Sequence, residues 1–171
     1  MFNESTGFSD VHIAEPVKKF DYKEHPHALG VHGNLYRFDR VSTQGGLEAR
    51  KIANDIADHS FRFSITNQGK FLGDVGVGDS DAHIHQHSDY IKIHHSHYSQ
   101  RPYTIFLRRN GEVLTFQDGR LDIPENVTNI VDITSSTGCH AALRADGELI
   151  LWGRCHGYHE LPVNKTMNWQ D

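Results

Sequence analysis

Three things are scarce in this sequence: long hydrophobic runs, cysteine and positive charge. The longest apolar runs have about five residues, whereas a helix that crosses a bilayer needs about 20. This predicts a chain without a transmembrane segment or a signal peptide, either intracellular or part of an assembled particle. Lysine and arginine number 17 against 22 acidic residues, a formal net charge of −5. Sequence-independent binding to nucleic acid needs a positive surface, so the charge argues against that class of protein.

The two cysteines, Cys139 and Cys155, are not spaced as CxxC. Small domains that depend on disulfides use several pairs, and zinc sites use cysteine or histidine at short, regular spacing. The sequence therefore favours two reduced thiols near a hairpin over a disulfide or a metal site.

Histidine is the one residue type in unusual abundance, with 14 among 171 residues. A histidine side chain gains its charge as the pH falls through about 6.5. Charging all 14 would reverse the sign of the net charge of −5. Hydrophobic residues make up 37% of the chain, which suffices for one modest core.

Residues 130–153, with the sequence IVDITSSTGCHAALRADGELILWG, show the organisation of the chain most clearly. Three short apolar runs are separated by a small-residue loop and by Asp146-Gly147. An Asp-Gly pair reaches positive φ easily and favours a two-residue β-hairpin. The pattern predicts three antiparallel strands in a meander, and none of it has helical periodicity.

The same pattern recurs four times when the hairpin glycines are aligned. These are Gly33, Gly69, Gly111 and Gly147, at intervals of 36, 42 and 36 residues. An aliphatic residue stands four positions before each glycine, and Leu, Phe or Val stands two positions after it. Each copy also begins with a short apolar strand, predicted at residues 17–20, 52–56, 90–93 and 130–133. Because a fixed period defines a repeat protein, the chain is predicted to consist of four repeats.

A unit of about 36 residues accommodates four strands of about five residues and their turns, which is one blade of a β-propeller. The predicted fold is all-β, a propeller-like array of about four short blades, either four-bladed or part of a shared ring. Residues 47–59 are interpreted as strand, with helix as the alternative. The predicted segments are an N-terminal arm at 1–16, repeats at 17–50, 51–89, 90–129 and 130–153, and a closing segment at 154–171.

The fourth copy resembles the repeat of the regulator-of-chromosome-condensation family, V-x-I-x-x-G-x-x-H-x-x-A-L-x-x-D-G-x-V-x-x-W-G. The matching residues are Ile133, Gly138, His140, Leu143, Asp146, Gly147, Leu149, Trp152 and Gly153. The third copy keeps Leu107, Asn110, Gly111, Val113 and Phe116, and the first two copies match less well.

The resemblance implies a propeller that binds other proteins. The family's propeller has seven blades, and its members include a guanine-nucleotide exchange factor and a secreted inhibitor of β-lactamases. The matching residues are packing and turn residues, so the resemblance implies a fold and no activity. This chain has four copies instead of seven. An unclosed propeller exposes an edge strand and unburied faces, which favours association.

The long interval between Gly69 and Gly111 contains all six candidate metal ligands: His83, His85, His87, His94, His95 and His97. If residues 83–87 are extended, positions i, i+2 and i+4 share one face, and three imidazoles in line could bind zinc. The alternative is a polar loop with unligated histidines. The piece Asp-x-His-x-His resembles the metal motif of amidohydrolase-type barrels, but such barrels need about 250 residues.

Other catalytic patterns are weak. No G-x-S-x-G motif occurs, and Cys139 and His140 are neighbours whose side chains would point to opposite faces of a strand. The glycine-rich residues 73–78 are not followed by a helix or by Lys-Ser/Thr, so a flexible loop is favoured over a phosphate site.

Two aromatic patterns remain. Phe38, Phe116 and Trp152 occupy one repeat position and are predicted to lie in the blade core. A basic and aromatic patch of Arg101, Tyr103, Arg108 and Arg109 is a candidate protein interface, with solvated strand ends as the alternative.

The sequence thus predicts a non-enzymatic protein-binding or assembly module, a homo-oligomer or a subunit of a larger assembly, a viral one included. No cofactor is predicted beyond the candidate zinc site, and neither nucleic acid nor membrane is an expected partner. The alternatives are a metal-dependent hydrolase that uses residues 83–97, and an interaction protein that responds to pH through its histidines.

Overall fold

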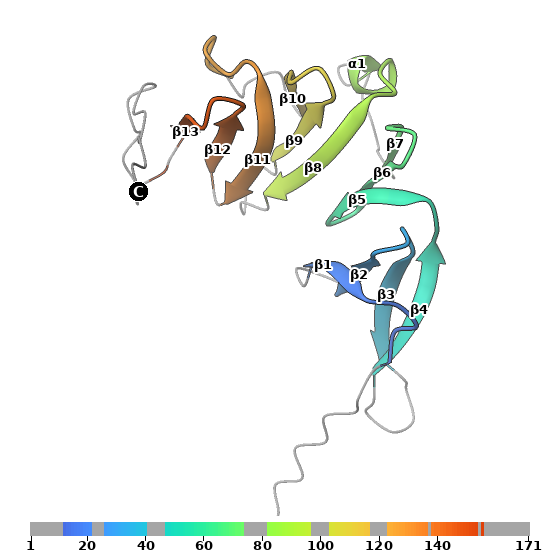
Figure 1. The fold of residues 1–171 in the computed structure, drawn as a ribbon. Helices are drawn as coiled ribbons and strands as arrows, with labels where there is room; N and C mark the ends of the chain where they lie inside the picture. The colour runs from blue at the N-terminus through green and yellow to red at the C-terminus, as the bar shows by residue number, and fades with distance from the viewer. Residues whose placement is uncertain are drawn as a thin grey trace, which may run out of the picture. The chain divides into compact units, whose positions relative to one another are not determined.

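A computed structural model describes residues 12–21, 26–40, 47–73, 82–96, 103–116, 123–136, 138–153 and 155. The chain divides into two compact units, Met1–Ile56 and Ala57–Asp171. The described residues form an all-β structure of four small antiparallel sheets and one helical turn (Figure 1). No helix in these ranges is long and apolar enough to cross a membrane.

Each sheet contains consecutive strands in chain order, as predicted for a meander. The first sheet contains β1 (Val17–Asp21), β2 (His27–Gly30), β3 (Leu35–Arg40) and β4 (Leu47–Ala53). The second contains β5 (Ile56–Ser60), β6 (Phe63–Thr66) and β7 (Phe71–Gly73). The third contains β8 (Tyr90–Ser96), β9 (Tyr103–Arg108) and β10 (Val113–Phe116). The fourth contains β11 (Ile130–Ser136), β12 (Cys139–Arg144) and β13 (Leu149–Gly153), and the helical turn α1 is Ala82–His85.

The four aligned glycines occupy the same corner of each sheet. Gly33, Gly69, Gly111 and Gly147 have φ values of 80°, 81°, 82° and 91°. The N–H of each donates to the carbonyl oxygen three residues earlier, at 2.8–3.1 Å. The repeat inferred from the glycine spacing is therefore present in the structure.

The hairpins themselves differ from the predicted two-residue turn. In the fourth sheet the N–H of Arg144 donates to the carbonyl oxygen of Glu148 at 2.8 Å, which closes a loop of three residues. This is a type I turn followed by a left-handed residue, and it places glycine third in the loop. The carboxylate of Asp146 accepts from the N–H of Glu148 at 3.1 Å, so the residue before the glycine fixes the turn with its side chain.

One backbone hydrogen bond connects each copy to the next. The carbonyl oxygens of Gly33, Gly69 and Gly111 accept the N–H groups of Ile56, Tyr90 and Ile130, at 2.9, 3.0 and 3.1 Å. The three donors begin β5, β8 and β11 and are almost fully buried, at 1%, 1% and 3% exposure. We call this contact the repeat join.

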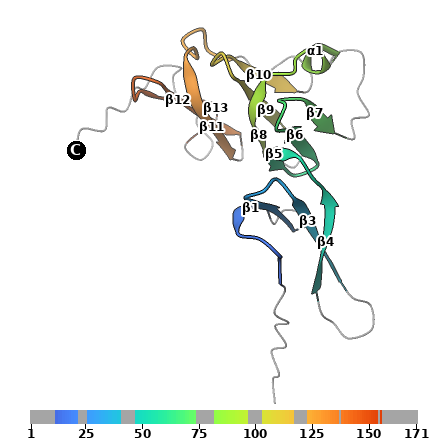
Figure 2. The same ribbon diagram turned by 45° about the vertical axis from the view of Figure 1, so that its right-hand side comes forward.

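The hydrophobic cores lie between copies rather than within them. Phe63, Ile65 and Phe71 of the second sheet pack with Tyr90, Ile93 and Phe106 of the third. Ile105, Leu107 and Val113 of the third sheet pack with residues of the fourth, including Ile130 and Ile133. Leu29 and Leu35 pack with Ile56 in the same way. The second, third and fourth sheets therefore follow one another side by side (Figure 2).

Residues 47–59 form strands, as predicted, and the helical alternative is wrong. The predicted opening strand of the second copy, residues 52–56, is misplaced. β4 ends at Ala53 and β5 begins at Ile56, because Asp55 has a left-handed φ of 61° that breaks the strand. β4 pairs with β3 and completes the first sheet.

The predicted aromatic core position is occupied as expected in one copy. Trp152 is 3% exposed and lies in the core between the third and fourth sheets. Phe38 is half-buried, with its ring 5.8 Å from that of Phe20. The side chain of Phe116 lies outside the described residues.

We predict that Gly111→Ala destabilises the protein more than Gly147→Ala does. Both positions have positive φ, so each alanine costs about 1 kcal/mol in backbone strain. A Cβ on Gly111 would also lie 2.9 Å from the backbone nitrogen of Ile130, whereas nothing approaches a Cβ on Gly147 within 4 Å. We expect Gly111→Ala to cost about 2 kcal/mol or more in urea denaturation. Equal losses would contradict the role of the repeat join.

Candidate functional site

The insertion between the second and third sheets carries α1 and is the first candidate site. Ile84 is fully buried in the core that the two sheets share. The hydroxyl of Tyr90, at the start of β8, donates to the carbonyl oxygen of Ile84 at 3.0 Å. Burial raises the pKa of Tyr90 to about 12, so the phenol stays protonated as a donor. Ile84 therefore anchors the helical turn α1 on this core, next to the described His85.

The histidines of the insertion do not form the predicted extended row. His83 and His85 lie in the helical turn α1, so the backbone at these two positions is not extended. His85 is exposed, with its ring 5.4 Å from that of Phe71. His87 is half-buried and meets the ring of Tyr90 edge-on at 6.2 Å. The side chain of His83 and all of His97 lie outside the described residues.

The two remaining candidate ligands, His94 and His95, are neighbours on β8. Their side chains therefore leave opposite faces of the sheet. His95 is 3% exposed and its Nδ1 lies 2.8 Å from the hydroxyl of Thr104. Its ring stacks on Phe61 at 4.6 Å. His95 is thus part of the packing between the second and third sheets. Among the residues the structure describes, no group of three or more His, Cys, Asp or Glu could hold a metal ion. The zinc site stays a prediction that involves residues beyond this set.

A histidine bonded to a hydroxyl recurs inside three sheets. Nδ1 of His59, His95 and His140 lies 3.0, 2.8 and 2.9 Å from the hydroxyls of Ser64, Thr104 and Ser135 respectively. His95 pairs with Thr104 across β8 and β9, and Ser135 pairs with His140 across β11 and β12. The histidine thus lies on the first strand of the third sheet but on the second strand of the fourth sheet, and the hydroxyl residue lies on the other strand of each pair. All six side chains are at most 7% exposed, so these pairs hold strands together and are not open to a substrate.

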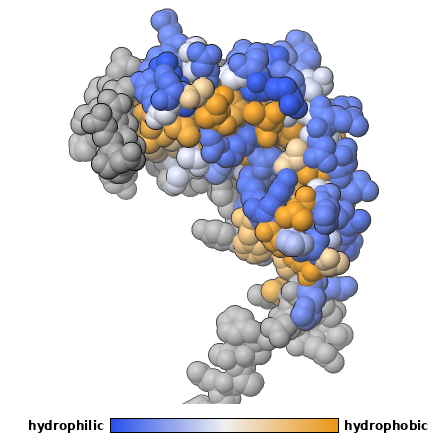
Figure 3. Space-filling model, viewed as in Figure 1, coloured by the Kyte–Doolittle hydropathy of each residue, from blue (hydrophilic) through white to orange (hydrophobic). Residues whose placement is uncertain are grey.

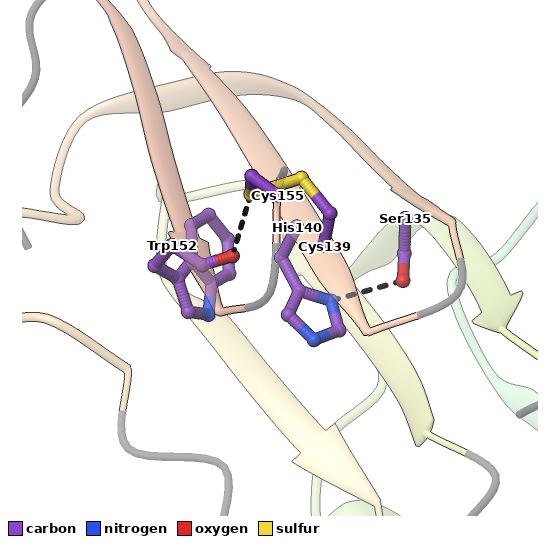
Figure 4. Close-up of a disulfide and its surroundings, with 5 residues drawn as sticks. All are labelled: Ser135, Cys139, His140, Trp152 and Cys155. Carbon is purple, nitrogen blue, oxygen red and sulfur yellow. Dashed lines mark hydrogen bonds between the residues drawn. A yellow bond between two sulfur atoms is a disulfide. The ribbon is translucent and has the colours of Figure 1, made fainter. Parts of the chain in front are cut away.

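His140 has the clearest electrostatic signature of these histidines. Its ring is fully buried, bonds Ser135 and lies 5.3 Å from the ring of Trp152 (Figure 4). Burial lowers the pKa of His140 to about 4, and the nearby His94 adds to the shift. A neutral imidazole is therefore built into the core of the fourth sheet.

The prediction of two reduced thiols is wrong, because Cys139 and Cys155 form a disulfide (Figure 4). Cys139 pairs with Gly153 across β12 and β13. Gly153 has a φ of 82° and ends β13, and Cys155 follows it with its Cα 4.4 Å from that of Cys139. The pairing could have been found by counting the register outward from the hairpin at Gly147. The spacing of the cysteines alone did not reveal it.

The predicted interface patch is only partly described. Nε of Arg108 donates to the carboxylate of Asp89 at 2.9 Å, and the guanidinium also pairs with Glu112. This hydrogen bond from Arg108 lowers the pKa of Asp89. Arg109 is exposed at the hairpin corner. Arg101 and the side chain of Tyr103 lie outside the described residues, so the interface stays a prediction. The guanidinium of Arg108 already forms ion pairs with Asp89 and Glu112 of its own chain.

Comparisons with known proteins give a fold and no family. No family model matches the chain, and no curated protein matches it. Among solved structures, the crystal structure of human WBSCR16 is similar with a TM-score of 0.51 and 15% sequence identity. The similarity covers 83% of this chain and 48% of that chain, so this chain spans about half the length of the solved protein.

Removing the disulfide should destabilise the fourth sheet. The bridge closes a loop with a sequence separation of 16, for which chain entropy gives about 3 kcal/mol of stabilisation. We expect the double variant Cys139→Ser/Cys155→Ser to lose about this amount in urea denaturation. Without reductant, the unfolded wild type should show no titratable thiol. Two reactive thiols in that assay would contradict the bridge.

The buried His140 should make stability fall with acid. Its pKa is about 4 in the folded state against 6.5 in the unfolded state, so the unfolded chain binds more protons between these values. The free energy of unfolding should therefore fall by about 3 kcal/mol from pH 6.5 to pH 4 through this residue. We expect His140→Gln to remove that part of the slope in urea denaturation, and His32→Gln, an exposed control, to keep it. Identical slopes in the wild type and His140→Gln would refute this assignment.

Proposed function

We propose that the chain is a non-enzymatic protein-binding or assembly module on a propeller-like scaffold, with each sheet as one blade. The observation that carries the proposal is the repeat join, made three times with one geometry. The first strands also contact one another. The carboxylate of Asp58 on β5 accepts from the N–H of Ile93 on β8 at 2.9 Å, and Lys92 on β8 pairs with Asp132 on β11. First strands side by side are what a propeller requires around its centre.

A repeat scaffold separates what is constant from what can vary. The joins, hairpin glycines and intervening cores recur, whereas the interval that contains α1 is longer than the others. Insertions in repeat proteins lie on one face, which is often the binding face. The exposed His85, the half-buried His87 and the hairpin residue Arg109 are therefore assigned to the contact surface.

The proposed partner is protein, either copies of this chain or another subunit. A net charge of −5 disfavours the phosphate backbone of nucleic acids. The disulfide favours an oxidising compartment or an assembled particle, because reducing compartments keep thiols free.

Two alternatives remain, and both involve the histidines. A metal-dependent hydrolase would need ligands from residues 83–97 to converge, and stoichiometric metal in protein purified without a histidine tag would favour it. A pH-responsive interaction protein is favoured by the abundance of histidine and by the exposure of His85. Acid would then change the charge of the proposed contact surface.

Light scattering tests the assembly form of the proposal. At pH 7.5 we expect a particle of at least twice the 19.4 kDa chain mass, which decreases on dilution. If the surface histidines control association, the mass should change at pH 5.5. A mass of 19.4 kDa at every concentration would contradict self-assembly and leave only binding to another protein.

A further inference from the structure

Among the described residues, the fourth sheet has one buried apolar face and one apolar face that is half-buried to exposed. Ala142, Ile150 and Trp152 point toward the third sheet and are at most 3% exposed. The alternate residues of β12 and β13 point the other way. They form cross-strand pairs and are called the tail face: Ala141, Leu143, Leu149 and Leu151. Figure 3 shows apolar surface among hydrophilic surface over the third and fourth sheets.

Leu143 and Leu149 of the tail face are less buried than the residues at the same repeat positions in the other copies. Leu143 is 37% exposed, whereas the residues at its repeat position, Leu29, Ile65 and Leu107, are at most 1% exposed. The space around the corner glycine also differs between the fourth copy and the second and third copies. A Cβ on Gly69 or Gly111 would meet the backbone of the next copy within 3 Å, but no described atom comes within 4 Å of the same point on Gly147.

The first strand of the first copy shows the complementary difference. Val17 and Phe20 are 44% and 56% exposed. The corresponding residues are Tyr90 and Ile93 in the third copy and Ile130 and Ile133 in the fourth, all at most 3% exposed. These residues are equivalent because each first strand has a bulge after its first residue. Each also pairs with residues at the same repeat positions of the second strand. Val17 and Phe20 are called the head face.

We propose that the tail face of one chain binds the head face of a second copy of this chain through a fourth repeat join. In it, the N–H of Val17 donates to the carbonyl oxygen of Gly147, and Val17 and Phe20 pack on Leu143 and Leu149. This inference rests on the proposed function, because it assumes that the sheets are equivalent repeats. The chain itself makes the same contact three times, at Gly33, Gly69 and Gly111.

Charge complementarity favours a second copy as the occupant. Lys92 pairs with Asp132 where the third sheet meets the fourth, and Lys19 stands at the position of Lys92 in the register of β1. Lys19 of a docked copy would therefore approach Asp132, which is half exposed.

A contact of this kind is heterologous, because two different faces meet. Every added copy leaves one head face and one tail face open, until a ring closes. Terminal repeats of stable monomeric arrays have polar outer faces, and the two faces here are apolar instead.

The experiment uses one variant that blocks each face. Phe20→Glu blocks the head face and Leu143→Glu blocks the tail face, while Ile91→Glu is the control. Ile91 is on β8, belongs to neither face and has the same 37% exposure as Leu143. Each blocked variant alone should have the 19.4 kDa mass of one chain in light scattering. An equimolar mixture should form a dimer of twice that mass, because one intact head face and one intact tail face remain. The wild type and Ile91→Glu should assemble further.

Several outcomes would overturn the inference. If the wild type assembles and neither blocked variant changes its mass, or if the mixture stays monomeric, the proposed function stands and the head-to-tail contact is wrong. If either blocked variant dimerises alone as strongly as the wild type, the contact pairs identical faces. A monomeric wild type whose stability falls with Leu143→Glu means that the chain covers its own tail face. Circular dichroism checks folding, and Val17→Asp replaces Phe20→Glu if the latter unfolds.

Discussion

The hydrogen bond from the first residue of one sheet to the corner glycine of the sheet before it is the constraint on which this structure depends. It requires a residue at positive φ, so that the hairpin carbonyl points out of its own sheet. It also requires the absence of a side chain, because a Cβ on Gly69 or Gly111 would lie within 3 Å of the backbone at the start of the next copy. Only glycine meets both requirements without strain. The regular spacing of these glycines therefore indicates a contact between neighbouring sheets as well as a hairpin turn.

Because the join recurs, stability is shared between neighbours. A sheet of three strands with three to seven residues each needs an apolar face that it can bury in order to be stable. Each of the first three sheets buries residues of its second and third strands against the first strand of the next sheet. In the third sheet, Leu107 of β9 and Val113 of β10 pack with Ile130 of β11. Such an array is approximately a sum of nearest-neighbour interfaces, and its two ends differ in kind. In the part of the chain that the structure describes, Val17 and Phe20 of the first strand are exposed at one end, and Leu143 beside the last hairpin is exposed at the other.

Local signals predicted the part of the fold that depends on local geometry. The Asn-Gly and Asp-Gly corners, the meander of residues 130–153 and the strands around residues 47–59 follow from turn chemistry and alternation. The helical turn at Ala82–His85 was missed, because Ile84 is anchored by a core and by Tyr90, which are not local. The disulfide and the histidine–hydroxyl pairs depend on strand register, and register is fixed only when the hairpin loop length is known. The abundance of histidine suggested a ligand set, yet His95 and His140 proved to be buried packing residues.

The position of the disulfide is related to the difference in burial between the fourth copy and the first three. In the first three copies the next first strand bonds the corner glycine and covers the aliphatic residue four positions earlier. The fourth copy has no such cover among the described residues, and Leu143 is 37% exposed there. It is also the copy in which Cys139 and Cys155 tie β12 to the residue that follows β13. A covalent link acts mainly on the unfolded chain, so it stabilises a sheet without needing a neighbour to pack on it. The bridge thus lies where the repeat scaffold supplies the least noncovalent support.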